Sequence, residues 1–126
     1  MAKVKATTRN QNYKTILQTG THTFLADEPT EVGGQDLGPT PVDFLASALA
    51  ACTTITLKMY AGRKGWELEA AEVNVEVDLK SEPGITRFKK DVLLKGNLTE
   101  EQKLRLFAIA EKCPVNKALK QNIVIE

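Results

Sequence analysis

The 126-residue chain contains one histidine, one tryptophan and two cysteines, and these shortages argue against several classes of protein. His22 alone cannot build a histidine-rich metal site, and Cys52 and Cys113 lie too far apart in sequence for a CxxC motif or a zinc ribbon. No metal or organic cofactor is therefore expected. The 17 Lys and Arg nearly balance the 16 Asp and Glu, so the net charge of +1 creates no field that would gather nucleic acid.

Long hydrophobic runs are also missing. The longest uncharged stretch, Phe44–Leu57, has 14 residues, whereas a helix needs roughly 20 to cross a bilayer. The N-terminal segment Met1–Lys5 alternates polar and apolar residues and does not resemble a secretory signal. These features predict a protein with no membrane partner, located in the reducing cytoplasm.

The composition is that of a folded globular protein. Apolar residues make up 42% and charged residues 26% of the chain, values far from those of disordered sequences. A mass of 13.8 kDa suits one compact core and leaves no room for a second. We therefore expect a single domain covering residues 1–126.

The first third of the chain is expected to form strands and a long loop. Residues 3–9, 13–18 and 21–26 are short runs that contain Thr, Val or Ile, which is typical of a meander of strands. Residues 27–40 hold two prolines and three glycines without helical or strand periodicity. A loop of this length in so small a domain often carries function.

A helix is predicted to begin at Pro41. Thr40 supplies a hydroxyl for the N-cap, and Asp43 stands three residues later, as in a capping box. The helix runs for about 22 residues, to Gly62, with small or apolar side chains on most sides. Since one other helix and a few short strands cannot cover it all round, the pattern favours a homodimer.

The second half is predicted to contain a hairpin, two helices and a last strand. Residues 71–80 alternate apolar and polar side chains, and the run from Arg87 to Leu94 returns after a Pro83-Gly84 turn with basic residues facing acidic ones. Helices follow over residues 99–112 and 114–120, and residues 122–126 close the chain as a strand. Because helices and strands are segregated along the chain, the fold class is α+β.

The cysteines are the strongest candidates for chemistry. Cys113 precedes Pro114, which suits the first position of a helix, so its thiol gains from the helix N-terminus and is the better thiolate on first principles. Cys52 lies in the middle of an apolar helix, where cysteine usually serves packing. His22 fits a structural role better than a ligand role, and the acidic side chains of Asp27 and Glu28 are either solvated or a general base.

Two segments resemble the cysteine motifs of one family. Ala26–Pro29 together with Gly33–Thr53 resembles the first motif of the OsmC/Ohr family, the osmotically inducible and organic hydroperoxide resistance proteins, and Glu111–Leu119 resembles the second. With the order of elements, the similarity covers nearly the whole chain. It implies an OsmC-like α+β fold with antiparallel sheets and two main helices, in an intertwined homodimer with the cysteine-bearing helices at its centre.

The resemblance also implies a function. The better-known members of the family reduce organic hydroperoxides through two cysteines, and by this resemblance Cys52 would be the peroxidatic thiolate and Cys113 the resolving cysteine. A thiol or dithiol reductant would close the cycle. In these reductases a glutamate follows the proline that corresponds to Pro41, and this chain has Val42 there, with Asp43 next along.

Other site residues are implied in the same way. The activating arginine of the family comes from the N-terminal strands, where this chain offers only Arg9. The segment Gly20–Pro29 looks like the less characterised OsmC-like branch, in which His22, Asp27 or Glu28 would line the site. A competing hypothesis is a noncatalytic dimer that binds a small apolar or acyl ligand at its interface and keeps the cysteines for packing.

Overall fold

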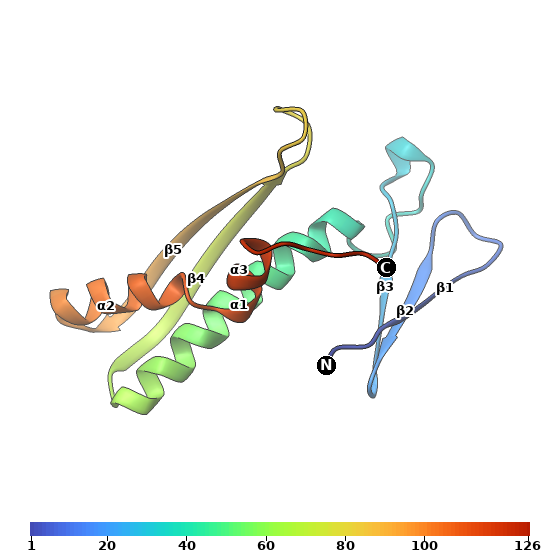
Figure 1. Ribbon diagram of the computed structural model, residues 1–126. Helices are drawn as coiled ribbons and strands as arrows, with labels where there is room; N and C mark the ends of the chain where they lie inside the picture. The colour runs from blue at the N-terminus through green and yellow to red at the C-terminus, as the bar shows by residue number, and fades with distance from the viewer. The chain divides into compact units, whose positions relative to one another are not determined.

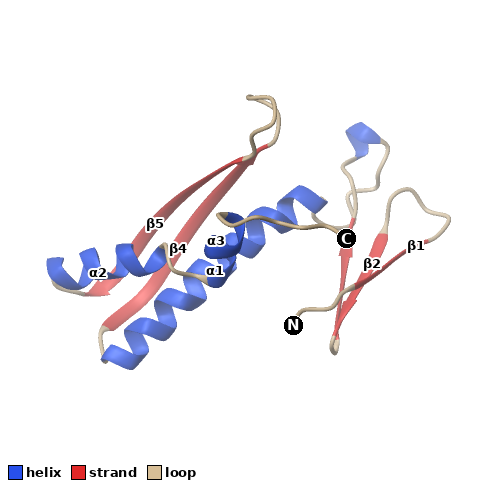
Figure 2. Ribbon diagram, viewed as in Figure 1, coloured by secondary structure: helices blue, strands red, loops and turns tan.

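The computed structural model describes all residues 1–126. The elements follow one another along the chain as shown in Figures 1 and 2: β1 Lys5–Thr8, β2 Thr15–Thr19, β3 His22–Ala26, the short 3₁₀ helix η1 Thr30–Val32, α1 Pro41–Lys64, β4 Glu67–Asp78, β5 Arg87–Asn97, α2 Glu100–Ala110 and α3 Pro114–Leu119. The chain divides into two compact units, Met1–Phe44 and Leu45–Glu126.

The first unit is a three-stranded antiparallel sheet followed by the long loop. The strand order β1-β2-β3 confirms the predicted meander, with Thr7 opposite Ile16 and Ile16 opposite Leu25. In the loop, the backbone of Gly38 passes so close to β3 that an added Cβ would lie 2.4 Å from the Leu25 carbonyl oxygen. The glycine therefore permits the loop to fold back on the strand that precedes it.

Helix α1 begins at Pro41, as the sequence predicts. The Thr40 hydroxyl accepts a hydrogen bond from the Asp43 N–H at 3.1 Å, while the Asp43 carboxylate accepts one from the Thr40 N–H at 2.9 Å. These reciprocal bonds satisfy two donors at the helix start. The helix ends at Lys64, two residues beyond the predicted Gly62, and Gly65 follows with a φ of 71°.

One stripe of α1 is buried, and its members are spaced four residues apart: Leu49, Thr53, Leu57 and Ala61. By length and composition alone, α1 is also long and apolar enough to cross a membrane, a criterion that core helices of soluble proteins meet as well. Leu57 and Ala61 of this stripe pack into the core described below.

In the second unit, β4 and β5 form the predicted long antiparallel hairpin. The register places Glu76 opposite Lys89 and Asp78 opposite Arg87, so acidic and basic side chains face each other as expected. Strand β4 begins at Glu67, four residues before the predicted start at Ala71. The early residues do not alternate cleanly because the register shifts between Leu68 and Ala70.

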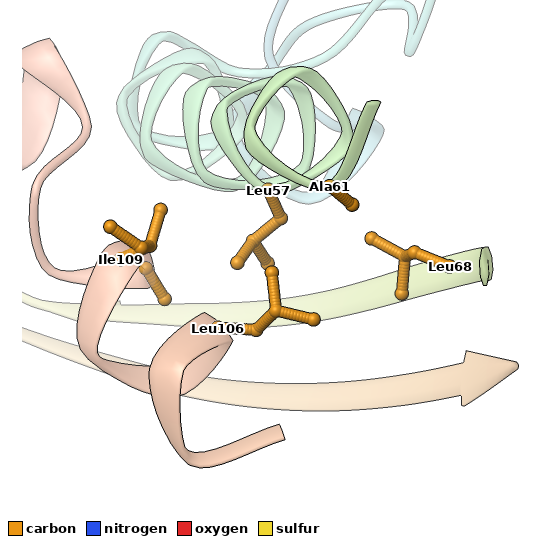
Figure 3. Packing of buried hydrophobic residues seen from close by; sticks show 6 residues of the cluster. Leu57, Ala61, Leu68, Leu106 and Ile109 are labelled. Atoms are coloured by element: carbon orange, nitrogen blue, oxygen red, sulfur yellow. The ribbon is translucent and has the colours of Figure 1, made fainter. Parts of the chain in front are cut away.

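The core of this unit lies between α1, α2 and the hairpin. In Figure 3, Leu57 and Ala61 point from α1 toward Leu68 on β4, and Leu106 and Ile109 face them from α2. Ala110 completes the cluster, in which all six residues are buried. This core fixes the C-terminal half of α1 against α2 and β4.

The two C-terminal helices agree with the sequence. Thr99 and Gln102 make the predicted capping box at the start of α2, and Cys113 is the N-cap of α3. Helix α2 ends at Ala110, two residues before the predicted Lys112, with Glu111 as its C-cap.

The predicted closing strand at residues 122–126 is wrong. The segment has no strand structure, and its side chains Ile123, Val124 and Ile125 are exposed. Its β-branched composition favours a strand, but a strand requires a neighbouring strand for its hydrogen bonds, and the chain supplies none there.

Candidate functional site

The two cysteines come together through the fold although they are far apart in sequence. Cys52 lies in the middle of α1 and is partly buried, whereas Cys113 is the N-cap of α3 and is fully buried. Both are free thiols, and the hydroxyl of Thr53, the residue that follows Cys52 on α1, lies 3.6 Å from Cys113 Sγ. The site is therefore a dithiol formed where α1 meets the start of α3.

Two backbone N–H groups in the first turn of α3 favour ionisation of the cysteines. That of Val115 lowers the pKa of the Cys52 thiol. The next backbone N–H, that of Asn116, donates to Cys113 Sγ at 3.3 Å. Pro114 contributes no N–H, so it leaves these two amides as the donors at this end of the helix.

The environment favours the thiolate form of Cys113. Burial raises the pKa of this thiol, but hydrogen bonds from Asn116, Thr53 and Cys52 and the nearby positive charge of Lys90 outweigh it and lower the pKa below its ordinary value. The expectation that Cys113 is the better thiolate on physical grounds agrees with this balance.

The environment of Cys52 has the opposite effect. Burial raises the pKa of its thiol, and the hydrogen bond and negative charge of Cys113 raise it further. The hydrogen bonds from Val115 and Thr56 oppose these effects without overcoming them. The pKa of Cys52 therefore lies above the ordinary value of a thiol, whereas that of Cys113 lies below it.

A lysine reaches into this site from the hairpin. Lys90 Nζ donates to the Ala110 carbonyl at 2.8 Å, to Asn116 Oδ1 at 3.2 Å and to Thr53 Oγ1 at 3.4 Å. The Thr53 hydroxyl in turn lies 3.6 Å from Cys113 Sγ. Lys90 is thus connected to the buried thiol through the side chain of Thr53 and through Asn116, whose backbone N–H donates to Cys113 Sγ.

The sequence reasoning missed Lys90, Asn116 and Thr53 as site residues. A signal for Lys90 was present, because it falls at the same strand parity as Phe88, Val92 and Leu94, which form the apolar face of β5. A charged residue in the middle of an apolar strand face usually has a specific buried partner. Thr53 and Asn116 carried no such signal.

The other predicted catalytic residues lie in the first unit. Asp43 is the capping-box residue of α1, and its carboxylate accepts the Thr40 N–H. Arg9 is exposed in the β1–β2 connection, where it lines a small cavity of about 50 Å³ with Thr7 and Lys14 among others.

The acidic loop has a structural role that its sequence did not reveal. Asp27 is buried, and its carboxylate accepts four backbone hydrogen bonds, from Tyr13, Glu28, Gln35 and Leu37. Burial raises the pKa of this carboxyl, but the four N–H donors outweigh burial and lower it. Glu28 is partly buried beside it, and His22 is exposed on β3. Asp27 therefore holds the loop together.

No cluster of three or more histidine, cysteine or carboxylate side chains is arranged to hold a metal ion. Two hollows are relevant to ligands. One, of about 450 Å³ in the first unit, is lined by apolar side chains that include Phe24, Phe44 and Leu17. The other, of about 380 Å³, lies over Lys90 and Asn116.

Solved structures similar to this chain share its fold. An OsmC-like protein from Mycoplasma pneumoniae is 19% identical with a TM-score of 0.79, over 95% of this chain and 87% of that one. An organic hydroperoxide resistance protein OsmC from Legionella pneumophila is 26% identical with a TM-score of 0.64, over 97% and 90%. The organic hydroperoxide resistance protein OhrB of Bacillus subtilis is 25% identical with a TM-score of 0.63, over 97% and 92%. No curated protein matches the chain.

The comparisons confirm the predicted α+β OsmC fold, with its two antiparallel sheets and helices. The family model described as OsmC-like protein matches residues 33–126, which include both cysteines and all of α1. The chain therefore belongs to the OsmC-like family.

Proposed function

We propose that this protein is a thiol-dependent peroxidase that reduces organic hydroperoxides through Cys52 and Cys113. The observation that carries the proposal is that Cys113, at the start of α3, lies 3.6 Å from the hydroxyl of Thr53, the residue that follows Cys52 on α1. A disulfide requires sulfur atoms that can reach each other with little movement of the backbone. Similar proteins from Legionella pneumophila and Bacillus subtilis are named for organic hydroperoxide resistance.

The reaction divides between the two sulfur atoms according to their exposure. Cys113 is fully buried, whereas Cys52 is partly exposed, so Cys52 is the thiol that meets the hydroperoxide. Its sulfur attacks the distal oxygen, the O–O bond breaks, and the products are an alcohol and a Cys52 sulfenic acid. Cys113 then attacks the sulfenic sulfur and releases hydroxide as the disulfide forms. A thiol or dithiol reductant, as available in a reducing cytoplasm, restores both thiols.

The decisive test is hydroperoxide consumption. Wild type with cumene hydroperoxide and dithiothreitol should turn over, and after one equivalent of hydroperoxide without reductant its mass should fall by two hydrogens. Cys52→Ser should consume none, and Cys113→Ser should stop at the sulfenic acid, which dimedone traps. Absence of consumption by folded wild type would reject the peroxidase.

The apolar hollow of the first unit supports a second candidate, a noncatalytic dimer that binds a small apolar or acyl ligand. Its lining is almost free of polar groups, and the rings of Phe24 and Phe44 lie 5.6 Å apart at its edge. A fluorescent fatty-acid probe should then bind to wild type and to Cys52→Ser equally, and bind less to Phe24→Ser. Peroxidase activity of wild type without binding of the probe would argue against this candidate.

We further propose that the 126 residues form one domain of a homodimer. Helix α1 is predominantly apolar but buries a single stripe, and Leu45, Ile55 and Met59 remain 45%, 53% and 61% exposed. Large exposed apolar patches mark interaction sites. Sedimentation should give a dimer for wild type and a monomer for Ile55→Glu with Met59→Glu. Leu93→Glu, which changes an exposed leucine on β5, is the control and should stay dimeric.

A further inference from the structure

A hollow of about 780 Å³ in the second unit lies outside the dithiol site. Tyr60 and Lys64 line it from the last turns of α1, Trp66 from the connection to β4, and Arg105 from α2. Hollows that hold small molecules commonly have volumes of about 300–1,000 Å³. No residue of the dithiol site lines this one, so the proposed reaction of the cysteines does not account for it.

Two aromatic rings form the apolar side of this hollow. The ring centroids of Tyr60 and Trp66 are 5.6 Å apart and the ring planes are inclined at 69°, an edge-to-face arrangement. Both side chains are partly buried and pack against the core, which fixes their positions. Leu104, which is 71% exposed on α2, adds an aliphatic side chain to the lining. A flat apolar group of a ligand would find nonpolar contacts here.

Two cations converge on the Tyr60 ring. Lys64 Nζ and Arg105 Cζ each lie 5.7 Å from the centroid of this ring. They are therefore no further apart than twice that distance, and like charges at such a separation repel each other. The ion pairs of the chain involve other residues, so neither cation has a carboxylate within 4.0 Å. An anion bound beside both cations would offset their repulsion.

The guanidinium of Arg105 is held in place for such an anion. Its Nε donates a hydrogen bond of 2.9 Å to the Tyr60 hydroxyl. This bond leaves the two terminal nitrogens, whose parallel N–H groups match the two oxygens of a carboxylate. The same hydrogen bond, with the positive charges of Arg105, Lys64 and Lys112, outweighs the effect of burial and lowers the pKa of Tyr60. The surroundings of the ring therefore favour negative charge.

An acidic side chain limits how much negative charge the ligand can carry. Glu101, in the first turn of α2, is exposed and also lines the hollow. Its carboxylate repels an anion, and it repels a phosphate ester with two charges more strongly than a ligand with one. A carboxylate is the singly charged group whose shape matches the fork of Arg105.

We propose that this hollow is a binding site for a small aromatic carboxylate, with the carboxylate beside Arg105 and Lys64 and the aromatic ring against Trp66. The site is separate from the dithiol, and the inference does not rest on the proposed peroxidase function. Lys64 also lies nine residues after Ile55, which places it on the opposite face of α1 from that side chain. The proposed dimer contact through Ile55 therefore does not involve Lys64.

The single tryptophan of the chain allows binding to be measured at the site itself. Trp66 gives the one indole N–H signal in a nitrogen–proton NMR spectrum, and the ring current of an aromatic ligand beside it shifts that signal. With 2-naphthoate as the probe, the shift should saturate with a Kd of about 1 mM or tighter. Absence of a saturable shift would overturn the proposal.

Two analogues of the probe separate its charge from its ring. 2-Naphthamide has the same ring without the negative charge and should bind about tenfold more weakly, because it gains nothing from the two cations. Decahydro-2-naphthoate keeps the charge on a saturated ring and should bind about threefold more weakly, the scale of aromatic pairing. Equal binding of 2-naphthoate and either analogue would overturn the assignment of an aromatic carboxylate.

Four variants locate the bound carboxylate. Arg105→Gln and Lys64→Gln each remove an exposed charge from the lining and should weaken binding about threefold. Glu101→Gln removes the opposing charge and should tighten binding about twofold. Arg63→Gln is the matched control, because Arg63 is exposed next to Lys64 but does not line the hollow, and it should bind as wild type does. Equal binding by Arg105→Gln, Lys64→Gln and Arg63→Gln would reject the proposed site.

Two further variants separate this site from the other proposals. Cys52→Ser should give the same Trp66 titration as wild type, whether or not wild type consumes hydroperoxide. Phe24→Ser alters the apolar hollow of the first unit and should also leave the titration unchanged. Loss of the Trp66 shift in either folded variant would place the ligand elsewhere and reject the assignment.

Discussion

The Lys90 ammonium donates a hydrogen bond of 3.2 Å to the side-chain oxygen of Asn116, which joins the middle of β5 to the first turn of α3. Asn116 is buried, and its side-chain nitrogen also donates to the Glu111 carbonyl at 2.9 Å. One asparagine therefore satisfies groups from two other segments of the chain. Removing the Asn116 side chain should therefore affect the stability of the protein as well as the ionisation of the thiols.

Replacing Asn116 by Ala should lower the free energy of unfolding by about 1–3 kcal/mol, because the partly buried ammonium of Lys90 and the carbonyl of Glu111 each lose a partner. Urea denaturation of the reduced protein measures the change. Asn122→Ala, at an exposed position in the C-terminal segment, should stay within about 0.5 kcal/mol of wild type. Equal stability of the two variants would show that Asn116 is dispensable for the fold.

The sequence predicts most elements because their signals are local. Thr40, Pro41 and Asp43 lie within one turn, and a capping box depends on nothing further away. The alternation in residues 71–80 and the pairing of Glu76 with Lys89 likewise depend on neighbouring positions and on one turn. Such features need no knowledge of the tertiary fold.

The site was predictable only in part, since its geometry is tertiary. The N-cap position of Cys113 follows from Pro114, but its place beside Thr53 requires α1 and α3 to meet. Asp27 looked like one of several solvated acids, and only the closed loop shows four backbone donors around it. The segment 122–126 has a strand composition, and no local pattern reveals that a partner strand is missing.

Two glycines should respond in opposite directions to the same change. Gly38→Ala should destabilise the protein by roughly 1–3 kcal/mol, because its Cβ would meet the Leu25 backbone. Gly62→Ala lies in α1 with open space around the added Cβ, so helix propensity should stabilise it by about 1 kcal/mol. Thermal unfolding of both variants measures the shifts. Stabilisation by Gly38→Ala would contradict the close approach of the loop to β3.

Val42→Glu should accelerate hydroperoxide reduction by about tenfold, which corresponds to ~1.4 kcal/mol of transition-state stabilisation. The substitution restores a carboxylate where the family resemblance expects one, and such a group can orient an arginine donated to the thiolate. Val42→Gln has a similar shape without the charge and is the matched control. An equal gain from both variants, or no gain from either in folded protein, would show that the missing carboxylate at position 42 does not limit hydroperoxide reduction.

The stability of the reduced protein should depend on pH through its two thiols, with opposite signs. The pKa of Cys113 is lowered from 9.0, so its contribution to stability is present above 9.0 and is lost as the pH falls through the lower folded value. The pKa of Cys52 is raised from 9.0, so its contribution is present below 9.0 and is lost as the pH rises through the higher folded value.

Urea denaturation in the presence of a phosphine reductant should therefore show stability that rises from neutral pH toward 9.0 relative to Cys113→Ser. Above 9.0, wild type should lose stability relative to Cys52→Ser. Other titrating groups are common to all three proteins, so the differences isolate the thiols. Lys90→Met should reduce the rise, because it removes the charge that stabilises the Cys113 thiolate, whereas Lys89→Met should preserve it. Parallel curves for wild type and Cys113→Ser would mean that the buried thiol ionises alike in the folded and unfolded chains.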